Sequence, residues 1–232
     1  MTKDRQTTSL LALGAGLLAA ALSGCSSIDD TADFAVNELL YADVEFVTKA
    51  PGDVEVFLAP AQDDRDLGAL PQHAGSFPIR YGSDEFWERP VPAMLDDVLE
   101  RELAHSQLFT QVVRLAAPQT VVIRPTVVAF HVGAQEGMAG AMSFAEVALR
   151  IEVLGPATAD GERPLWHDQT YANGQRTEHS VNPISPYRLI GRALRLAVTD
   201  ALSGLDGSNV ARSDVPVASP TGGAAEASAT RR

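Results

Sequence analysis

The sequence predicts an α+β fold, a two-layer sandwich in which a mostly antiparallel sheet of four to five strands carries two helices on one face. Residues 92–106 and 186–204 have apolar side chains at helical spacing, and several other segments alternate apolar and polar residues as strands do. The order along the chain is strand, long loop, helix, several strands and helix. Such elements bury their apolar faces most simply as two layers, so we expect one domain over residues 51–205.

The first strand of this domain is predicted at residues 54–58, where Val-Glu-Val-Phe-Leu follows the turn residues 50–53. Upstream, residues 34–47 lack a clean period and are predicted to form a short helix or turn and then a strand. Downstream, residues 59–90 are rich in Pro, Gly and Asp. We expect them to be irregular, with Arg80-Tyr81 adding a short edge strand.

The first helix is predicted at residues 92–106, with Pro92 at its first position. Asp97 and Arg101 are four residues apart on the polar face and are expected to pair. After the helix, residues 108–113 are expected to lead into a strand. The apolar stripe of the helix consists of Leu95, Val98, Leu99 and Leu103.

Two hairpins are predicted in the second half of the domain. Residues 120–132 are rich in Val and Ile, although Pro125 predicts that the end or an edge of this strand faces away from a continuous ladder. Glycines between 133 and 140 break the pattern and are expected to form the tip of the first hairpin. Alternation resumes at Phe144, and residues 165–171 are predicted to complete the second hairpin.

The last helix is predicted to start at Ser185-Pro186, an N-cap followed by a first-turn proline, and to stop at Gly204. Residues 206–232 contain mainly Ser, Ala, Gly and Pro and are predicted to be a disordered tail, because they cannot bury enough apolar surface to offset the entropy of ordering. The buried face of the helix is expected to consist of Ile190, Ala193, Leu194, Ala197 and Ala201.

The amino terminus has the features of a signal peptide. Lys3 and Arg5 precede an apolar run from Leu10 to Leu22, which is too short to span a membrane with comfort. No second apolar run of about 18 residues occurs in the sequence. We therefore expect residues 1–24 to be a removable signal peptide.

The run ends in Leu22-Ser23-Gly24-Cys25, which resembles the lipobox of bacterial lipoproteins. The resemblance implies diacylation of the Cys25 sulfur, cleavage between Gly24 and Cys25, and N-acylation of the new amine, for example by palmitate. This covalent lipid is the only prosthetic group expected, and two or three acyl chains anchor a protein stably, at ~0.8 kcal/mol per buried methylene. The alternative is a signal peptide in which Cys25 is incidental. Residues 25–50 are predicted to be the lipidated cysteine and a tether.

The charge of the chain argues against nucleic acid as a partner. The net charge is −12, and removal of residues 1–24 leaves −13, so phosphates and anionic headgroups are repelled. Membrane attachment therefore depends on the lipid. Cys25 is the only cysteine, and once it is acylated no disulfide can form.

The residues after Cys25 bear on sorting. In enteric-type bacteria, an Asp after the lipidated cysteine retains a lipoprotein in the inner membrane, and here Ser26 and Ser27 follow it. By this resemblance we expect the protein on the periplasmic face of the outer membrane, held by its lipid. The sorting rule differs between bacterial groups, so inner-membrane retention stays an alternative.

No pattern in the sequence predicts catalysis, and the protein is expected not to be an enzyme. A nucleophile elbow, a phosphate-binding loop and a dinucleotide fingerprint are all absent from the sequence. Residues 63–66, Asp-Asp-Arg-Asp, could open a calcium loop, but Gly68 and Gly75 stand where further ligands belong. We expect a solvated loop in which Arg65 pairs with a neighbouring aspartate. Cys25, as a lipidation site, is the one site residue predicted; catalytic, cofactor-binding and metal-binding residues are not.

The histidines do not form a recognisable zinc motif, because no two of them are three or four residues apart and no thiol is available. His167-Asp168 resembles part of a catalytic pair, but consecutive residues of a strand point to opposite faces of the sheet. Trp87 and Trp166 are expected to pack in or around the core. The five histidines are His73, His105, His131, His167 and His179.

Short motifs between residues 54 and 205 are similar to those of the ABC-type transport auxiliary lipoproteins. That family combines a Tyr, a Trp followed by a Pro, a helix with Met-Leu and spaced leucines, a Ser-Gly-Leu-Phe exit with a Val, and a strand ending in Leu-Trp before a later aromatic. The matching positions are Tyr81, Trp87, Pro90, Met94-Leu95, Leu99, Leu103, Ser106-Gln107-Leu108-Phe109, Val112-Val113, Leu165-Trp166 and Tyr171.

The sequence departs from this pattern in three places. Gln107 stands where Gly is usual, an Asp-rich insertion precedes Tyr81, and a Tyr-x-Leu strand is not evident after the lipobox. The helix exit at 106–109 also resembles that of other small periplasmic lipoproteins, with folds like the N-terminal domain of the translocation protein TolB or the lipopolysaccharide-assembly lipoprotein.

The resemblance to the transport family implies a non-catalytic outer-membrane lipoprotein that docks onto a mammalian-cell-entry-type substrate-binding protein, helps to move lipid across the periplasm, and can assemble as a ring-shaped homo-oligomer. The likeness to the assembly lipoproteins implies instead a scaffold or plug for an outer-membrane barrel or a cell-wall synthase. A lipid-anchored hydrolase is a third class that no residue supports. The identity of a co-purifying envelope protein would distinguish these alternatives.

Overall fold

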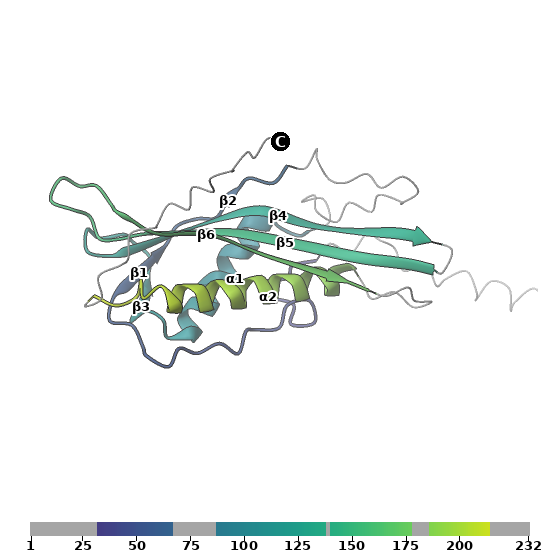
Figure 1. Ribbon diagram of the computed structural model, residues 1–232, viewed down its shortest axis with the longest axis horizontal. Helices are drawn as coiled ribbons and strands as arrows, with labels where there is room; N and C mark the ends of the chain where they lie inside the picture. Colours follow the sequence, from purple (N-terminus) through teal and green to yellow (C-terminus); the bar gives the residue numbers. More distant parts are fainter. Residues whose placement is uncertain (1–31, 67–86, 138–139, 178–185, 214–232) are drawn as a thin grey trace, which may run out of the picture. The chain divides into compact units, whose positions relative to one another are not determined.

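The computed structural model describes residues 32–66, 87–137, 140–177 and 186–213 (Figure 1). Among them, no helix is long and apolar enough to cross a membrane. Cys25, the proposed strand at Arg80-Tyr81 and most of the predicted tail lie outside these residues. The elements are β1 (Glu55–Leu58), β2 (Gln62–Asp63), α1 (Val91–Ser106), β3 (Gln111–Val113), β4 (Val121–Gly137), β5 (Gly140–Leu154), β6 (Leu165–Arg176) and α2 (Pro186–Gly207).

The sheet has six strands in the order β3-β1-β4-β5-β6, with β2 also paired to β4. The antiparallel hairpins β4-β5 and β5-β6 are present as predicted. However, β1 is parallel to both β3 and β4, and β2 is parallel to β4, so the sheet is mixed. Parallel neighbours need a long crossover, and α1 supplies it between β1 and β3. The predicted α+β class is thus observed, with more strands and more parallel pairing than expected.

Helix α1 covers the predicted segment and begins one residue earlier, at Val91. Its stripe of Leu95, Val98, Leu99 and Leu103 is buried, as predicted. The expected ion pair between Asp97 and Arg101 does not form, because each finds a partner on another segment: Asp97 contacts Arg89 and Arg101 contacts Asp43.

The helix ends at Gln107, whose φ of 58° places a non-glycine residue in the left-handed region. We expect Gln107→Gly to stabilise the fold by about 0.5–1 kcal/mol. Glycine removes the steric cost of a β-carbon in the left-handed region, and this gain exceeds the additional backbone entropy that glycine loses on folding. The exposed Gln107 side chain makes no packing contribution that would be lost. Equilibrium urea unfolding would measure the change. Gln107→Ala keeps the β-carbon and should give no gain; an equal gain from both variants would contradict this explanation.

Strands β4 and β5 form a long hairpin whose inner face depends on a bulge. The register shifts between Val127 and Ala129. Before the bulge, odd-numbered residues such as Ile123 and Val127 are buried. After it the parity changes, and the even-numbered Phe130 and Val132 are buried. One extra residue therefore keeps the apolar side chains on the core face along the whole strand.

Pro125 pairs with Ile151 inside the β4-β5 ladder. On the opposite side of β4, the partner changes at this point: Ala59 donates to the Ile123 carbonyl, and Asp64 donates to the Val127 carbonyl. Pro125 thus lies at the gap between β1 and β2, where the absence of an N–H costs no ladder bond, in agreement with the predicted interruption.

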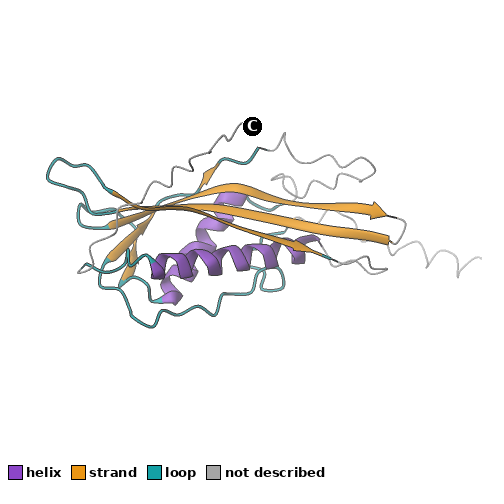
Figure 2. Ribbon diagram, viewed as in Figure 1, coloured by secondary structure: helices purple, strands orange, loops and turns teal. Residues whose placement is uncertain are grey.

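Helix α2 lies against β4, β5 and β6 and shares one core with α1, and Figure 2 shows α1 crossing behind α2. Its five predicted core residues are buried. The helix does not stop at Gly204 but continues to Gly207. Gly204 instead faces the Tyr171 hydroxyl, which lies 2.0 Å from where a β-carbon would stand. This glycine permits close packing of α2 on β6.

Residues 32–50 pack on the domain, contrary to the prediction that all of 25–50 forms a tether. Phe34, Tyr41 and Val44 are buried, and Asp33 pairs with Arg89 at 2.7 Å. The strand expected within 34–47 is absent, since after a series of turns this segment has no ladder partner. Its contacts are made by individual side chains rather than by a periodic face.

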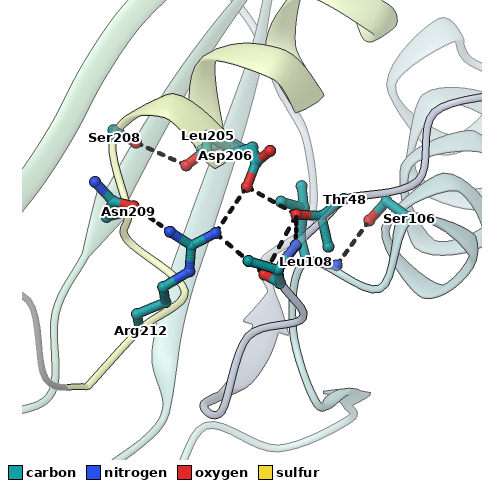
Figure 3. A network of polar contacts seen from close by, with 9 residues as sticks. Thr48, Ser106, Leu108, Leu205, Asp206, Ser208, Asn209 and Arg212 are labelled. Atoms are coloured by element: carbon teal, nitrogen blue, oxygen red, sulfur yellow. Dashed lines mark hydrogen bonds and ion pairs between the residues drawn. The ribbon is translucent and has the colours of Figure 1, made fainter.

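Residues 206–213 are also packed, so the predicted tail starts later than residue 206 (Figure 3). Asp206 accepts a hydrogen bond from the Thr48 hydroxyl at 2.9 Å and contacts the Arg212 guanidinium at 3.2 Å. Arg212 also donates to the Ala50 carbonyl. These contacts join the end of α2 to the segment before β1, and therefore extend the domain beyond 51–205 at both ends.

Candidate ligand-binding groove

The histidines that the structure describes do not gather at one site. His105 is exposed at the end of α1, His131 lies 3.4 Å from Glu146, and His73 and His179 are outside the described residues. Within the described part of the chain, no group of three His, Cys, Asp or Glu side chains could hold a metal ion. As expected, Arg65 pairs with a neighbouring aspartate, Asp63, at 2.6 Å.

His167 and Asp168 point to opposite faces of β6, as predicted. The His167 Nε2 atom lies 2.8 Å from the Tyr171 hydroxyl, with the two rings stacked, whereas Asp168 binds the Arg150 guanidinium through both carboxylate oxygens. Burial raises the pKa of Tyr171 to about 12. The pair therefore has no shared chemistry, and each residue stabilises its own side of the sheet.

Burial lowers the pKa of His167, and also that of His131, below the ordinary histidine value near 6.5. The folded state favours the neutral rings. Their contribution to the free energy of unfolding is therefore complete above about pH 6.5, and it is lost as the pH falls toward the pKa values of the folded state. We expect the free energy of unfolding to decrease between pH 7.5 and 5.5. Urea unfolding across this range would measure it. The decrease should be smaller in His167→Gln and unchanged in the exposed control His105→Gln.

Trp87 packs in the core, as predicted. Its ring forms edge contacts with Phe34, Phe130 and Tyr187 at centroid distances of 5.3–5.6 Å. Its Nε1 is the one buried side-chain polar atom without a hydrogen-bond partner among the described residues. The cluster joins the start of the packed chain to β4 and α2, which is a structural role.

A groove of about 520 Å³ lies along the exposed side of α2, and we name it the α2 groove. Figure 1 shows the coil before β1 running along this helix. One wall consists of Val44, Glu45 and Phe46 of the coil, and Gln175 of β6 also lines the groove. The α2 wall consists of Arg192, Arg195, Leu196 and Thr199.

The coil contacts both helices. The buried Glu102 carboxylate of α1 accepts hydrogen bonds from the Tyr41 hydroxyl and the Val44 amide, both at 2.9 Å. At Gly191, the Leu40 carbonyl oxygen lies 1.6 Å from where a β-carbon would stand. The coil wall of the α2 groove is therefore positioned by packing against both helices.

The charged side chains that line the α2 groove are two arginines and one glutamate. Arg192 makes no hydrogen bond or ion pair within the described part of the structure. Arg195 contacts Glu45 at 4.0 Å, the limit of an ion pair, and the Glu45 side chain is 96% exposed. Leu196, which directly follows Arg195 and is 41% exposed, adds an apolar side chain to the same groove. The arrangement combines available positive charge with an apolar wall.

A second, smaller hollow of about 310 Å³ lies between α1 and the β1-β3 edge. Asp96, Glu100 and Arg114 line it together with apolar strand residues. Burial raises the pKa of Asp96, and its carboxylate accepts a hydrogen bond from the Ala61 amide at 2.7 Å. Since this carboxylate already joins α1 to the chain after β1, the α2 groove is the better candidate site.

Our sequence-based expectations did not include the α2 groove. Part of the signal was available, because Arg188, Arg192 and Arg195 recur at intervals of four and three on the polar face of the predicted helix. The coil wall carried no comparable pattern. Its position depends on contacts that residues 41–46 make with distant helices.

Comparison with known proteins gives a fold relationship only. No family model matches the sequence, and no curated protein matches it. Among solved structures, the protein XCC0632 from Xanthomonas campestris, described by the family model DUF330, has a TM-score of 0.50 and 15% sequence identity over 72% of this chain and 94% of that chain. At this identity, the similarity shows a shared fold.

Two further structures are more distant. The hypothetical protein CT253 from Chlamydia trachomatis has a TM-score of 0.42 and 11% identity over 69% of this chain and 98% of that chain. Lipoprotein GNA1162 from Neisseria meningitidis has a TM-score of 0.26 and 14% identity over 65% of this chain and 99% of that chain. At these scores, neither likeness carries an argument about the present protein.

Proposed function

We propose that this protein is a lipoprotein, anchored through Cys25 to the periplasmic face of the outer membrane, that acts as a non-catalytic auxiliary component of an ABC-type, mammalian-cell-entry-type lipid transport system. The observation that carries the proposal is the Leu22-Ser23-Gly24-Cys25 motif at the end of a signal-peptide-like run. The motifs between 54 and 205 that are similar to the auxiliary lipoproteins support the transport role.

The structure adds a constraint on the anchored form. Ala32 is the first residue that the structure describes, and six residues, 26–31, lie between it and Cys25 in the sequence. Even a fully extended chain of this length spans no more than about 25 Å. An acylated Cys25 would therefore keep the start of the domain close to the bilayer surface, where contact with a membrane transport complex is favoured.

The proposal is tested by isolating the full-length protein from solubilised cell envelope and identifying the proteins that accompany it, with Cys25→Ala as the control. We expect a mammalian-cell-entry protein or its ABC permease with the wild type, and loss of both the acyl modification and membrane association in Cys25→Ala. Density-gradient separation of the two membranes would test the outer-membrane assignment.

Other outcomes would overturn the transport role. Recovery of an outer-membrane barrel or a cell-wall synthase would support the scaffold alternative. A wild-type protein that fractionates without any envelope protein would contradict both functions. An unmodified Cys25 would contradict the anchor itself.

A further inference from the structure

We infer that the α2 groove is a binding site for one anionic amphiphile. The carboxylate or phosphate head would contact Arg192 and Arg195, and the acyl chain would lie against Val44, Phe46 and Leu196. The inference rests on the proposed function and deepens it, because it assigns a direct ligand to a domain otherwise proposed to act through protein contacts.

Several arginines outside the α2 groove are paired with aspartates. Arg89, Arg101 and Arg150 are each held by at least one aspartate at 2.7–2.9 Å. Within the described residues Arg192 has no such partner, and the contact of Arg195 with Glu45 is long and exposed. Arg192 and Arg195 differ from the other arginines without a partner among the described residues because both line one groove.

The spacing of these two groups suits a single anion. Residues three apart on a helix have β-carbons about 5–6 Å apart, and like charges at this spacing repel each other. An anion between them would remove the repulsion and accept hydrogen bonds from both guanidinium forks, which match carboxylate and phosphate oxygens. Gln175 also lines the groove, but its side-chain amide already donates to the Asn173 side chain and the Gly174 carbonyl, so the two arginines are the donors for the anion.

The size and lining of the groove favour an acyl chain over a partner helix. Its volume of about 520 Å³ lies within the range of small-molecule sites. A protein helix is 10–12 Å across, so two turns of it occupy roughly 1,000 Å³. Val44 is buried, but Phe46 is half-buried and Leu196 is 41% exposed, which leaves apolar surface for a ligand to cover.

The test uses the full-length acylated protein in phosphatidylcholine nanodiscs and three photoactivatable probes with the same diazirine-bearing C16 chain. The probes are the free fatty acid, the lysophosphatidic acid and the neutral monoacylglycerol. Adducts are quantified on the intact protein by mass spectrometry and then localised by digestion. We expect the anionic probes to label residues 44–46 and 192–199 at least tenfold more than the neutral probe. A preference between the two anionic probes identifies the head group.

Two variants give the decisive comparison. In Arg192→Glu/Arg195→Glu, labelling by the anionic probes is expected to fall at least tenfold. The matched control is Arg114→Glu/Arg124→Glu, which makes the same charge change at exposed positions outside the groove and should label within twofold of the wild type. Leu196→Trp fills the groove without removing charge and should also reduce labelling. Circular dichroism verifies that each variant is folded.

Three outcomes would overturn the inference. They are equal labelling by all three probes, labelling that persists in Arg192→Glu/Arg195→Glu, and adducts found only at other segments. Isolating the same variants from solubilised envelope and identifying the accompanying proteins shows whether the binding site or the proposed function is wrong. A transport partner recovered with a protein that takes up no probe would leave the proposed function intact. Specific labelling without a transport partner would leave the binding site and remove the proposed function.

Discussion

Replacing Gly191 by alanine is expected to destabilise the fold by about 3 kcal/mol. The added β-carbon would stand 1.6 Å from the Leu40 carbonyl oxygen and 2.7 Å from the carbonyl carbon. These are backbone atoms, so no side-chain rotation relieves the clash. The turn that carries them is fixed by hydrogen bonds from the Leu40 and Tyr41 amides to the Asn37 carbonyl. Either α2 or the coil must move.

Urea unfolding would measure the effect as a lower midpoint with an unchanged slope. Gly207→Ala is the matched control in the same helix, because a β-carbon there meets no atom within 4 Å. It should be neutral or stabilising, since alanine has the higher helix propensity. A loss below about 1 kcal/mol for Gly191→Ala would show that the coil does not press on α2.

Glu102→Ala is expected to destabilise the fold by about 2–5 kcal/mol, because it leaves two buried donors without an acceptor. The Tyr41 hydroxyl and the Val44 amide both donate to one Glu102 carboxylate oxygen, and Glu102 is 1% exposed. Burial and the adjacent Glu102 carboxylate raise the pKa of Tyr41 far above its usual value, so the phenol remains protonated and continues to need an acceptor.

Two control variants separate the hydrogen bonds from the loss of helix surface. Glu102→Gln keeps an acceptor oxygen and should recover most of the stability, at a cost of about 1 kcal/mol for the lost charge assistance. Glu100→Ala, exposed on the same helix, should stay within about 0.5 kcal/mol of the wild type. If Glu102→Ala were as mild as Glu100→Ala, the buried carboxylate would not hold the coil.

Both substitutions also bear on the α2 groove. Gly191 and Glu102 position the coil from opposite helices, and this coil supplies Val44 and Phe46 to the groove. In mild variants that remain folded, such as Glu102→Gln, labelling by an anionic amphiphile should decrease less than in the Arg192→Glu/Arg195→Glu variant. Any loss of binding in Glu102→Gln would then result from displacement of the coil, because both arginines of the groove are still present.

The two helices and the antiparallel hairpins were predictable from the sequence because their signals are local. The apolar stripes of α1 and α2 repeat at the helical period, and the alternation of β5 repeats every two residues. Each pattern identifies the buried face without reference to its partner. The ends of the helices were less predictable, as Gly204 shows, since a packing contact with Tyr171 replaces a stop signal there.

The parallel pairs of the sheet were not predictable from these local patterns. Residues 54–58 predict a strand with one buried face, but the partner of β1 depends on where α1 returns the chain. The bulge between Val127 and Ala129 was also missed, because alternation over 120–132 does not reveal a change of parity until the partner strand sets the register.

The sequence by itself determined the α+β class, the buried faces of both helices, the hairpins and the acidic charge, and it predicts the anchor at Cys25. These features depend on residues close together in the chain. The tertiary structure alone decided the mixed sheet, the packing of residues 32–50 and 206–213, and the α2 groove. The groove brings Phe46 near Arg192, about 150 residues apart, and such a contact exists only once both have packed against a common core.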